Sequence, residues 1–472
     1  RFVRNMVAGS TGLDLAMLIV AADDGVMPQT VEHVDILNLL QVRGGLIVIT
    51  KIDMVDELLV EVAAEEVVEL VKGTVLEGAE VCRVSSVTGD GIPELRAKLE
   101  QLAMSVEPRQ SHGSFRMPVQ RVFSLPGIGT VVTGIPLSGT VSPGTELEVL
   151  PGGQRIKVRG IHAYGGKVEE AVAGHSTALS VPDAKEYGVH RGMVCASPGD
   201  FSAGDAVDVD LTLTPRSPRL KHRVPIRFHT GTVEVRGQLL LLDRDETKPG
   251  EALVARLELD ENVACHPADR FLLRLQNPAV TVGGGRILRL EESGRYRRKD
   301  LGAELQGIVD AGDEPEARLQ HELDQAGPVG CAVDELARAL SLEEAKVLEL
   351  TQELAGAEVH DKGMRVFLRE QVAVGERELL DSVDKMLARR PAAASVKRSS
   401  IRTTRTLPAE LVEFVVEKMQ ASGRVKAGSQ GSILFLDRLK PLPAAEQAKF
   451  DRMISVCDSR AFRPPTLEEL GA

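Results

Sequence analysis

The stretch Leu46-Ile47-Val48-Ile49-Thr50-Lys51-Ile52-Asp53 decides the fold of the first part of this chain. An unbroken apolar run followed by polar residues is typical of a parallel strand, because helices cover both faces of such a sheet. Lys51 and Asp53 then lie at the carboxyl edge of the sheet, where α/β proteins bind ligands. A carboxylate there can accept two N–H bonds from a guanine edge, and a lysine stem can lie on the purine face. The stretch predicts a guanine-nucleotide pocket.

The phosphate loop that usually accompanies such a pocket is missing from the sequence. Nowhere do the 472 residues read Gly-x-x-x-x-Gly-Lys-Ser/Thr. Because the chain starts at Arg1, we expect a GTPase that has lost its front end, with no GTP turnover of its own. A plainer interpretation makes Asp53 only a helix cap, since Asp is common there. The pair Ser85-Ser86, one strand later, favours the nucleotide pocket.

Composition limits the remaining classes of function. Lys and Arg number 57 against 69 Asp and Glu, a net charge of −12, so nucleic acid could bind only at local basic patches. With no Trp and three Tyr, base stacking on aromatic rings is disfavoured. Five cysteines without a Cys-x-x-Cys pair suit a reducing cytoplasm and argue against a disulfide frame or a zinc site. No run approaches the roughly 20 apolar residues of a membrane span, so we expect no membrane partner.

The pattern of the sequence changes twice along the chain, which divides it into three kinds of domain. Alternating strands and helices predict a doubly wound α/β domain, short β-branched runs with Gly and Pro predict two antiparallel barrels, and helical periodicity follows. Pro215 and Pro218 mark the seam between the barrels. Val425 lies 66 residues after Val359 in a similar pattern, which indicates repeated winged helices. We expect the α/β domain at 1–108, barrels at 114–210 and 218–292, and winged helices at 300–372, 376–440 and 445–472.

Several motifs, each unspecific alone, together resemble the translational GTPases over essentially the whole chain. Thr50-Lys51-Ile52-Asp53 is similar to the family's Asn-Lys-x-Asp, and Ser85-Ser86-Val87 to its Ser-Ala-x loop. Thr in place of that Asn, and winged helices after two barrels, resemble the bacterial selenocysteine-specific elongation factors. The other matching stretches are Arg1-Phe2-Val3-Arg4-Asn5-Met6, Asp23-Asp24-Gly25, Gln29-Thr30-x-Glu32-His33, Gly127 to Gly134, and Thr281-Val282-Gly283-Gly284-Gly285.

The resemblance implies a GTP- and GDP-binding factor that delivers selenocysteyl-tRNA to the ribosome at a recoded UGA codon. Its winged-helix tail would dock on an mRNA hairpin, and Mg²⁺ would accompany the nucleotide in the full-length protein. Asp23 and Asp24 look like metal ligands, but we interpret them as a turn. The guanine-binding residues implied are Thr50, Lys51, Asp53, Ser85, Ser86 and Val87.

The resemblance also implies an aminoacyl pocket in the first barrel, and here the chain departs from the family. Gln120-Arg121 stands where the family has Asp-Arg, and Ser176 where it has a further Arg. Positive groups suit an anionic selenolate, so we expect Gln120, Arg121 and His175 to form the pocket. The departures leave open a non-hydrolysing adaptor that binds tRNA or ribosome. A general elongation or initiation GTPase is disfavoured by the helical tail.

A basic, hydroxyl-rich stretch precedes a helix in the tail. Lys397, Arg398, Arg402 and Arg405 alternate with serines and threonines, which suits phosphate contacts by a winged helix. A solvated loop is the alternative.

Overall fold

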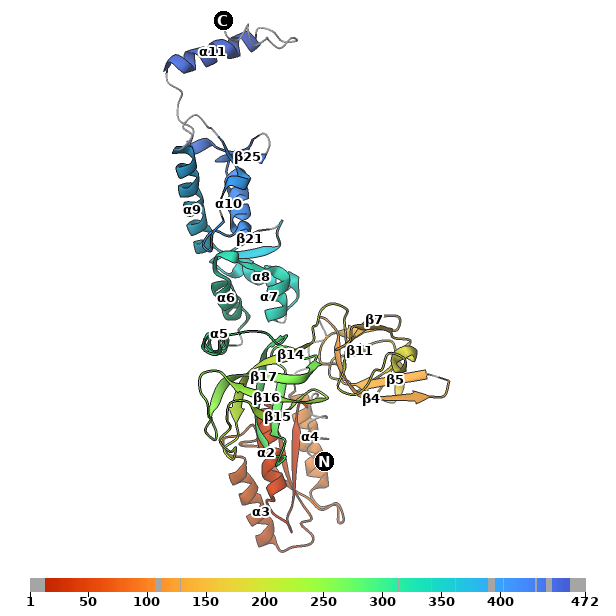
Figure 1. The fold of residues 1–472 in the computed structure, drawn as a ribbon. Coiled ribbons are helices and arrows are strands. Elements are labelled where there is room, and N and C mark those ends of the chain that lie inside the picture. The colour runs from red at the N-terminus through yellow and green to blue at the C-terminus, as the bar shows by residue number, and fades with distance from the viewer. Residues whose placement is uncertain are drawn as a thin grey trace. The chain divides into compact units, whose positions relative to one another are not determined.

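The chain forms two compact units in the computed structural model (Figure 1). The structure describes residues 13–106, 113–127, 129–312, 314–340, 342–360, 362–388, 395–401, 403–428, 431–438 and 444–458. The first unit runs to His321 and includes Asp334–Val347. The second consists of Glu322–Val333 and the residues from Leu348 onward.

A three-stranded parallel sheet organises the first domain. Its strands follow one another across the sheet as β1 (Ala16–Ala21), β2 (Gly45–Thr50) and β3 (Val81–Arg83). β2 is central, which explains why all four residues Leu46–Ile49 are buried. The helices are α2 (Pro28–Leu39), α3 (Glu57–Leu70) and α4 (Ile92–Met104). The predicted parallel α/β fold of this domain is confirmed.

The second domain is an antiparallel sheet of eight strands, in the order β10-β9-β12-β5-β4-β13-β7-β8. Its core gathers residues from most of these strands, including Met117, Val132, Leu147 and Leu179. Two further short strands, β6 (Thr140–Val141) and β11 (Ala171–Val172), pair with each other. The strands of the large sheet are β4 (Arg116–Leu125), β5 (Gly129–Gly134), β7 (Glu146–Leu150), β8 (Gln154–Lys157), β9 (Gly160–Ala163), β10 (Gly166–Val168), β12 (Thr177–Ser180) and β13 (Val194–Ala196).

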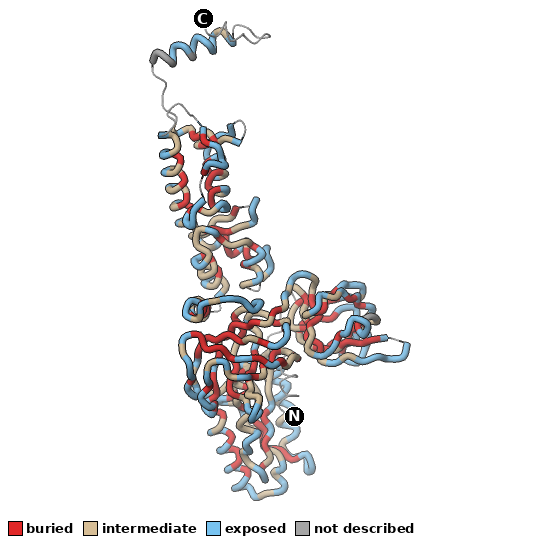
Figure 2. The backbone as a smooth tube through the Cα atoms, in the orientation of Figure 1, coloured by how far each residue is buried: buried red, intermediate tan, exposed pale blue. Residues whose placement is uncertain are grey.

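The third domain is a closed six-stranded antiparallel barrel, ordered β14-β17-β16-β15-β18-β19. Apolar residues from all six strands are buried in its interior, and Figure 2 draws these buried segments in red. β14 (Gly204–Leu213) falls largely within the segment expected to close the preceding barrel at residue 210. It pairs instead with β17 and β19, and the two prolines of the expected seam lie in the following loop. The other strands are β15 (Val224–Thr230), β16 (Val233–Leu241), β17 (Ala252–Val263), β18 (Arg270–Leu275) and β19 (Thr281–Glu291).

The barrel contacts both domains that precede it. On one side, Ile36 and Leu39 of α2 pack against Leu272 of β18. On the other, Arg116 at the start of β4 donates to both carboxylate oxygens of Asp269, at 2.5 and 2.8 Å. Apolar packing therefore joins the first domain to the barrel, and a bidentate ion pair joins the second domain to it.

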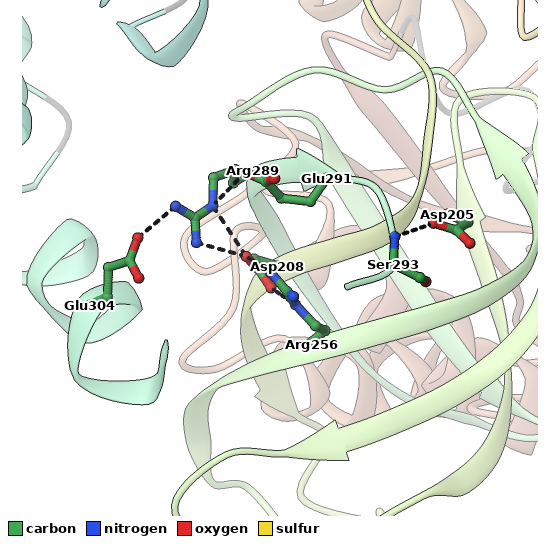
Figure 3. Close-up of polar contacts among 7 residues, drawn as sticks. All are labelled: Asp205, Asp208, Arg256, Arg289, Glu291, Ser293 and Glu304. Atoms are coloured by element: carbon green, nitrogen blue, oxygen red, sulfur yellow. Dashed lines mark hydrogen bonds and ion pairs between the residues drawn. The ribbon is translucent and has the colours of Figure 1, made fainter. Parts of the chain in front are cut away.

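Helix α5 (Arg298–Ala311) packs on the outside of the barrel over an ionic cluster (Figure 3). Asp208 is fully buried and accepts two bonds from Arg256, at 2.6 and 2.7 Å. Arg289 contacts the same carboxylate at 3.2 Å and reaches Glu304 of α5 at 2.6 Å. Tyr296 covers the Arg256 guanidinium at 4.5 Å. α5 is thus joined to the barrel by charge as well as by apolar packing.

The region beyond α5 is mainly helical, as predicted. Within the second unit, two small antiparallel sheets have the orders β20-β22-β21 and β23-β25-β24, and α9 and α10 share one apolar core. Among the described residues, no helix is long and apolar enough to cross a membrane. The elements are α6 (Pro315–Ala326), β20 (Cys331–Ala332), α7 (Val333–Leu340), α8 (Glu344–Glu353), β21 (Ala357–His360), β22 (Arg365–Leu368), α9 (Arg369–Ala388), β23 (Ser395–Lys397), α10 (Ala409–Ala421), β24 (Val425–Ala427), β25 (Ser432–Phe435) and α11 (Ala444–Asp458).

Candidate functional site

The carboxyl ends of the three parallel strands lie side by side at one edge of the first domain. Ala22 N–H donates to the Thr50 carbonyl at 2.9 Å, and Val84 N–H donates to the Ile49 carbonyl at 2.8 Å. These bonds hold the first residues of the loops after β1, β2 and β3 next to one another. The structure therefore brings the loops of Asp23, Asp53 and Ser85 to the same edge, where open α/β sheets bind ligands.

Lys51 links two of these loops. Its backbone is left-handed, with φ of 60°, which is unusual for a residue with a side chain. Its ammonium lies 2.8 and 2.7 Å from the two carboxylate oxygens of Asp23 and 3.6 Å from Asp24. The hydrogen bond from Lys51 lowers the pKa of Asp23, and the same bond raises the pKa of Lys51. A strained residue held by an ion pair at a ligand-binding edge is typical of a functional site.

Ser85 stabilises the loop after β3 with its side chain. It is fully buried, and its hydroxyl oxygen accepts bonds from the N–H groups of Val87 and Thr88, both at 3.1 Å. Its side chain is therefore engaged in the turn, whereas Ser86 and Val87 are exposed. Thr50 makes a long contact from its hydroxyl to the Val20 carbonyl, at 3.5 Å, across to β1.

Asp53 differs from the carboxylates around it. Its side chain is exposed, and within the described ranges no donor or cation is paired with its carboxylate. Asp56, three residues on, caps α3 by accepting from Leu59 N–H at 2.9 Å. The helix therefore has its own cap, and Asp53 is not needed for that role.

Of the three residues expected to hold the aminoacyl group, Gln120 and Arg121 lie in the large sheet of the second domain and His175 lies in the turn before β12. Gln120 occupies a bulge in β4, and Arg121 follows it, exposed, opposite Thr133 of β5. β12 lies on the other side of β5, and His175 lies two residues before it. His175 makes an edge contact with the ring of Tyr164, with centroids 4.9 Å apart. Gln120 and Arg121 are neighbours on one strand, and no described contact links them to His175.

The basic stretch of the tail is partly engaged within the fold. Lys397 ends β23, and Arg398 pairs with Glu413 of α10 at 3.4 Å. Arg405 is exposed in the loop before α10. Arg402 lies outside the described residues.

No group of three or more metal-binding side chains gathers anywhere in the described parts of the chain. Asp23, the most tempting metal ligand, is paired with Lys51. These residues therefore do not form a complete Mg²⁺ site.

Comparison with known protein families decides the assignment. Residues 1–105 match the Elongation factor Tu GTP binding domain, and residues 206–293 match the beta-barrel domain of the selenocysteine-specific elongation factor. The selenocysteine-specific elongation factor of Desulfomicrobium baculatum is 36% identical over 434 residues, which cover 90% of this chain and 68% of that protein. The chain belongs to the selenocysteine-specific elongation factor family.

Solved structures agree with this membership in the family of translational GTPases. A bacterial selenocysteine-specific elongation factor EF-Sec has the same fold over 97% of this chain and 72% of its own, with a TM-score of 0.71 at 21% identity. The elongation factor SelB of Methanococcus maripaludis, in complex with the GTP analogue GppNHp, covers 61% of this chain and 68% of its own. The match to this structure has a TM-score of 0.56 at 25% identity.

Sequence reasoning missed two features of this elongation factor. The ion pair between Lys51 and Asp23 joins residues 28 positions apart, and only the side-by-side order of β1 and β2 reveals it. The buried role of Ser85 was also missed, although a serine followed by Thr88 and Gly89 is a signal for such a turn.

Proposed function

We propose that this chain is the GTP-binding carrier of selenocysteyl-tRNA, and that guanine binds at the carboxyl edge of its first sheet. Membership of the selenocysteine-specific elongation factor family and the GTP analogue bound by the Methanococcus maripaludis relative support this. The observation that carries the guanine assignment is the exposed carboxylate of Asp53, which has no partner among the described residues and lies beside the loops of β1 and β3.

The roles of the individual groups follow from the chemistry of guanine. Asp53 would accept the two N–H groups on the Watson–Crick edge, which a carboxylate can do and an amide cannot. The Lys51 stem would lie along the ring while its ammonium remains with Asp23. Ser86 and Val87 would present the exposed turn to the guanine carbonyl, with Ser85 holding that turn and Thr50 tying β2 to β1.

The sequence lacks the motif that would hold the phosphates and Mg²⁺ of the nucleotide. The sequence contains no Gly-x-x-x-x-Gly-Lys-Ser/Thr, whose backbone amides and Lys would hold the phosphates. When bound in a translational GTPase, Mg²⁺ neutralises charge on the phosphates during transfer. We expect the 472-residue polypeptide to recognise guanine without hydrolysing GTP.

The second domain would receive the aminoacyl end of the tRNA. Arg121 is exposed and would pair with an anionic selenolate. Gln120 can donate only neutral hydrogen bonds, and His175 would add positive charge when protonated. Selectivity for selenocysteine over serine would thus rest mainly on Arg121.

The tail would act as RNA-binding winged helices on the ribosome. The order of α9, β23, α10, β24 and β25 matches a winged helix, and Lys397 and Arg405 offer exposed cations beside it. Together with Arg398 and Arg402, they would contact phosphates of the mRNA hairpin.

Competition binding tests the proposal. A fluorescent GDP analogue is titrated with the full chain and then displaced by GDP or ADP. We expect GDP to displace the analogue and ADP to fail, because adenine presents no pair of N–H donors to Asp53. Equal displacement by both would refute guanine recognition, and phosphate release from GTP above the buffer rate would refute the expected lack of turnover.

A further inference from the structure

Lys51, the first residue after β2, has a backbone conformation that is unfavourable for a residue with a side chain. Its φ of 60° lies in the left-handed region. The ion pair with Asp23 does not explain why this strain is kept. The Lys51 side chain is 43% exposed, and an exposed ion pair contributes less to stability than such a backbone conformation costs. Strain that the local contacts do not offset indicates a functional position.

The loop that carries Asp23 is anchored on both sides of that residue. Before it, Ala22 N–H donates to the Thr50 carbonyl at 2.9 Å. After it, Val26 N–H donates to the Glu66 carboxylate of α3 at 3.3 Å. The backbone around Asp23 is therefore tied to both β2 and α3, which gives the Asp23 carboxylate a defined place beside Lys51.

The Asp23 carboxylate restricts where the Lys51 side chain can lie. Its two oxygens lie 2.8 and 2.7 Å from the Lys51 ammonium, whereas an oxygen of Asp24 lies 3.6 Å away. An unrestricted lysine samples many rotamers, and fixing it when a ligand binds costs conformational entropy. Because Asp23 restricts the ammonium end, a ligand that packs against the Lys51 stem loses less of this entropy on binding.

We propose that Asp23 is a positioning residue of the guanine site, which acts through Lys51 and makes no contact with the nucleotide itself. Asp23 keeps the Lys51 stem in place along the purine ring, and Asp53 distinguishes guanine from other bases by its hydrogen bonds. This inference rests on the proposed guanine site. It assigns affinity for any purine nucleotide to Asp23 and discrimination between purines to Asp53, and these two properties can be measured separately.

Binding of two purine nucleotides to the full chain tests the proposal. GDP and inosine diphosphate displace the fluorescent GDP analogue, and inosine lacks the amino group of guanine, so it offers Asp53 one N–H donor fewer. Asp23→Asn keeps the size of the side chain and removes its charge. Asp24→Asn is the matched control, because it removes a neighbouring charge that is 60% exposed and lies farther from the Lys51 ammonium.

We expect Asp23→Asn to weaken the binding of GDP and of inosine diphosphate by the same factor, about fivefold to tenfold. The ratio of the two affinities should stay as in the unmodified chain. Asp24→Asn should weaken both by less than about twofold. In a chain that also carries Lys51→Met, Asp23→Asn should have no further effect, because the residue through which Asp23 acts has been replaced.

GDP binding by Asp23→Asn as tight as by the unmodified chain would overturn the proposal. So would an undiminished effect of Asp23→Asn in the Lys51→Met chain. A changed ratio of the two affinities would also overturn it, since the loop of Asp53 would then have moved. These three results leave the guanine site itself intact. Failure of the unmodified chain to bind GDP would instead refute the guanine site, and this proposal with it.

Discussion

Replacement of Asp208 by Asn should destabilise the barrel of the third domain more than any exposed ion pair could. Asp208 is fully buried and contacts both Arg256 and Arg289, so Asp208→Asn leaves two guanidinium groups facing a neutral amide. Breaking a buried pair on one side costs about 3–5 kcal/mol. Arg289 keeps Glu304, and Arg256 keeps the Tyr296 ring, so we expect the lower end, about 3 kcal/mol.

Hydrogen exchange measured by mass spectrometry reads this loss directly in peptides from β14 and β17. A loss of about 3 kcal/mol should accelerate exchange there roughly 100-fold, because 1.4 kcal/mol is a factor of ten. Glu291→Gln removes a partly exposed partner of Arg289 and serves as the control, with an expected effect below about 1 kcal/mol. Replacing the pair by Asp208→Leu/Arg256→Met should recover part of the loss. Exchange in Asp208→Asn within threefold of the unmodified chain would refute the reasoning.

Three further predictions concern the contacts between the domains and the aminoacyl pocket. Burial and then Arg116 lower the pKa of His266 from 6.5 to about 4, so the unfolded chain binds more protons between these values. Burial raises the pKa of Asp269, but Arg116 outweighs it and the net pKa lies below its usual value, so its contribution is also lost on acidification. Thermal melting should therefore show a loss of stability from His266 as the pH falls from 6.5 towards about 4, and a further loss from Asp269 as the pH falls below its usual pKa of 3.8; constant stability over both ranges would contradict this. Glu32→Gln, which disturbs bonds to Arg274 and Thr281, should cost about 1 kcal/mol and speed exchange in α2, whereas unchanged α2 exchange would count against that contact. Arg121→Met should weaken selenocysteyl-tRNA binding roughly tenfold to 100-fold in a filter assay while leaving the seryl form of the same tRNA nearly unaffected. Equal losses for both tRNAs would remove Arg121 from selenolate recognition.

Local patterns predicted the α/β domain well. The apolar run before Thr50 is the central strand of the parallel sheet, and the expected alternation of strands and helices is present, with β1 and β3 on either side of it. β3 ends at Arg83 because Ser85 turns the chain immediately afterwards. Hydrophobic periodicity and turn residues are enough to predict a fold in which each strand or helix packs against elements that are close to it in sequence.

Long-range pairing limited the prediction of the β domains. β14 resembles any other short strand, and only its partners β17 and β19, far along the chain, assign it to the third domain. Proline positions were a poor guide, since Pro215 lies in a loop inside that domain. Sequence pattern locates strands, but the closure of a barrel depends on contacts between distant segments.

The sequence predicted which residues gather at the candidate site. It did not predict which of them are exposed to a ligand and which support the loops. Asp53 and Ser85 could be placed at one sheet edge from strand order alone. That Ser85 is buried in a turn and that Lys51 pairs with Asp23 depends on loop geometry. Motif spacing therefore identified the edge, and the structure distinguishes exposed groups from supporting ones.

The change of Asp53 to Asn tests guanine recognition most directly. An amide in place of the carboxylate loses two charge-assisted hydrogen bonds, each worth about 1.5–3 kcal/mol, so affinity for GDP should fall at least about 100-fold. Xanthine carries a carbonyl where guanine carries an amino group, so the variant should instead gain affinity for xanthosine diphosphate. Asp56→Asn removes the same charge three residues away and keeps the helix cap, so it should leave both affinities unchanged. If Asp53→Asn bound GDP as well as the unmodified chain and gained nothing for xanthosine diphosphate, the guanine site would lie elsewhere.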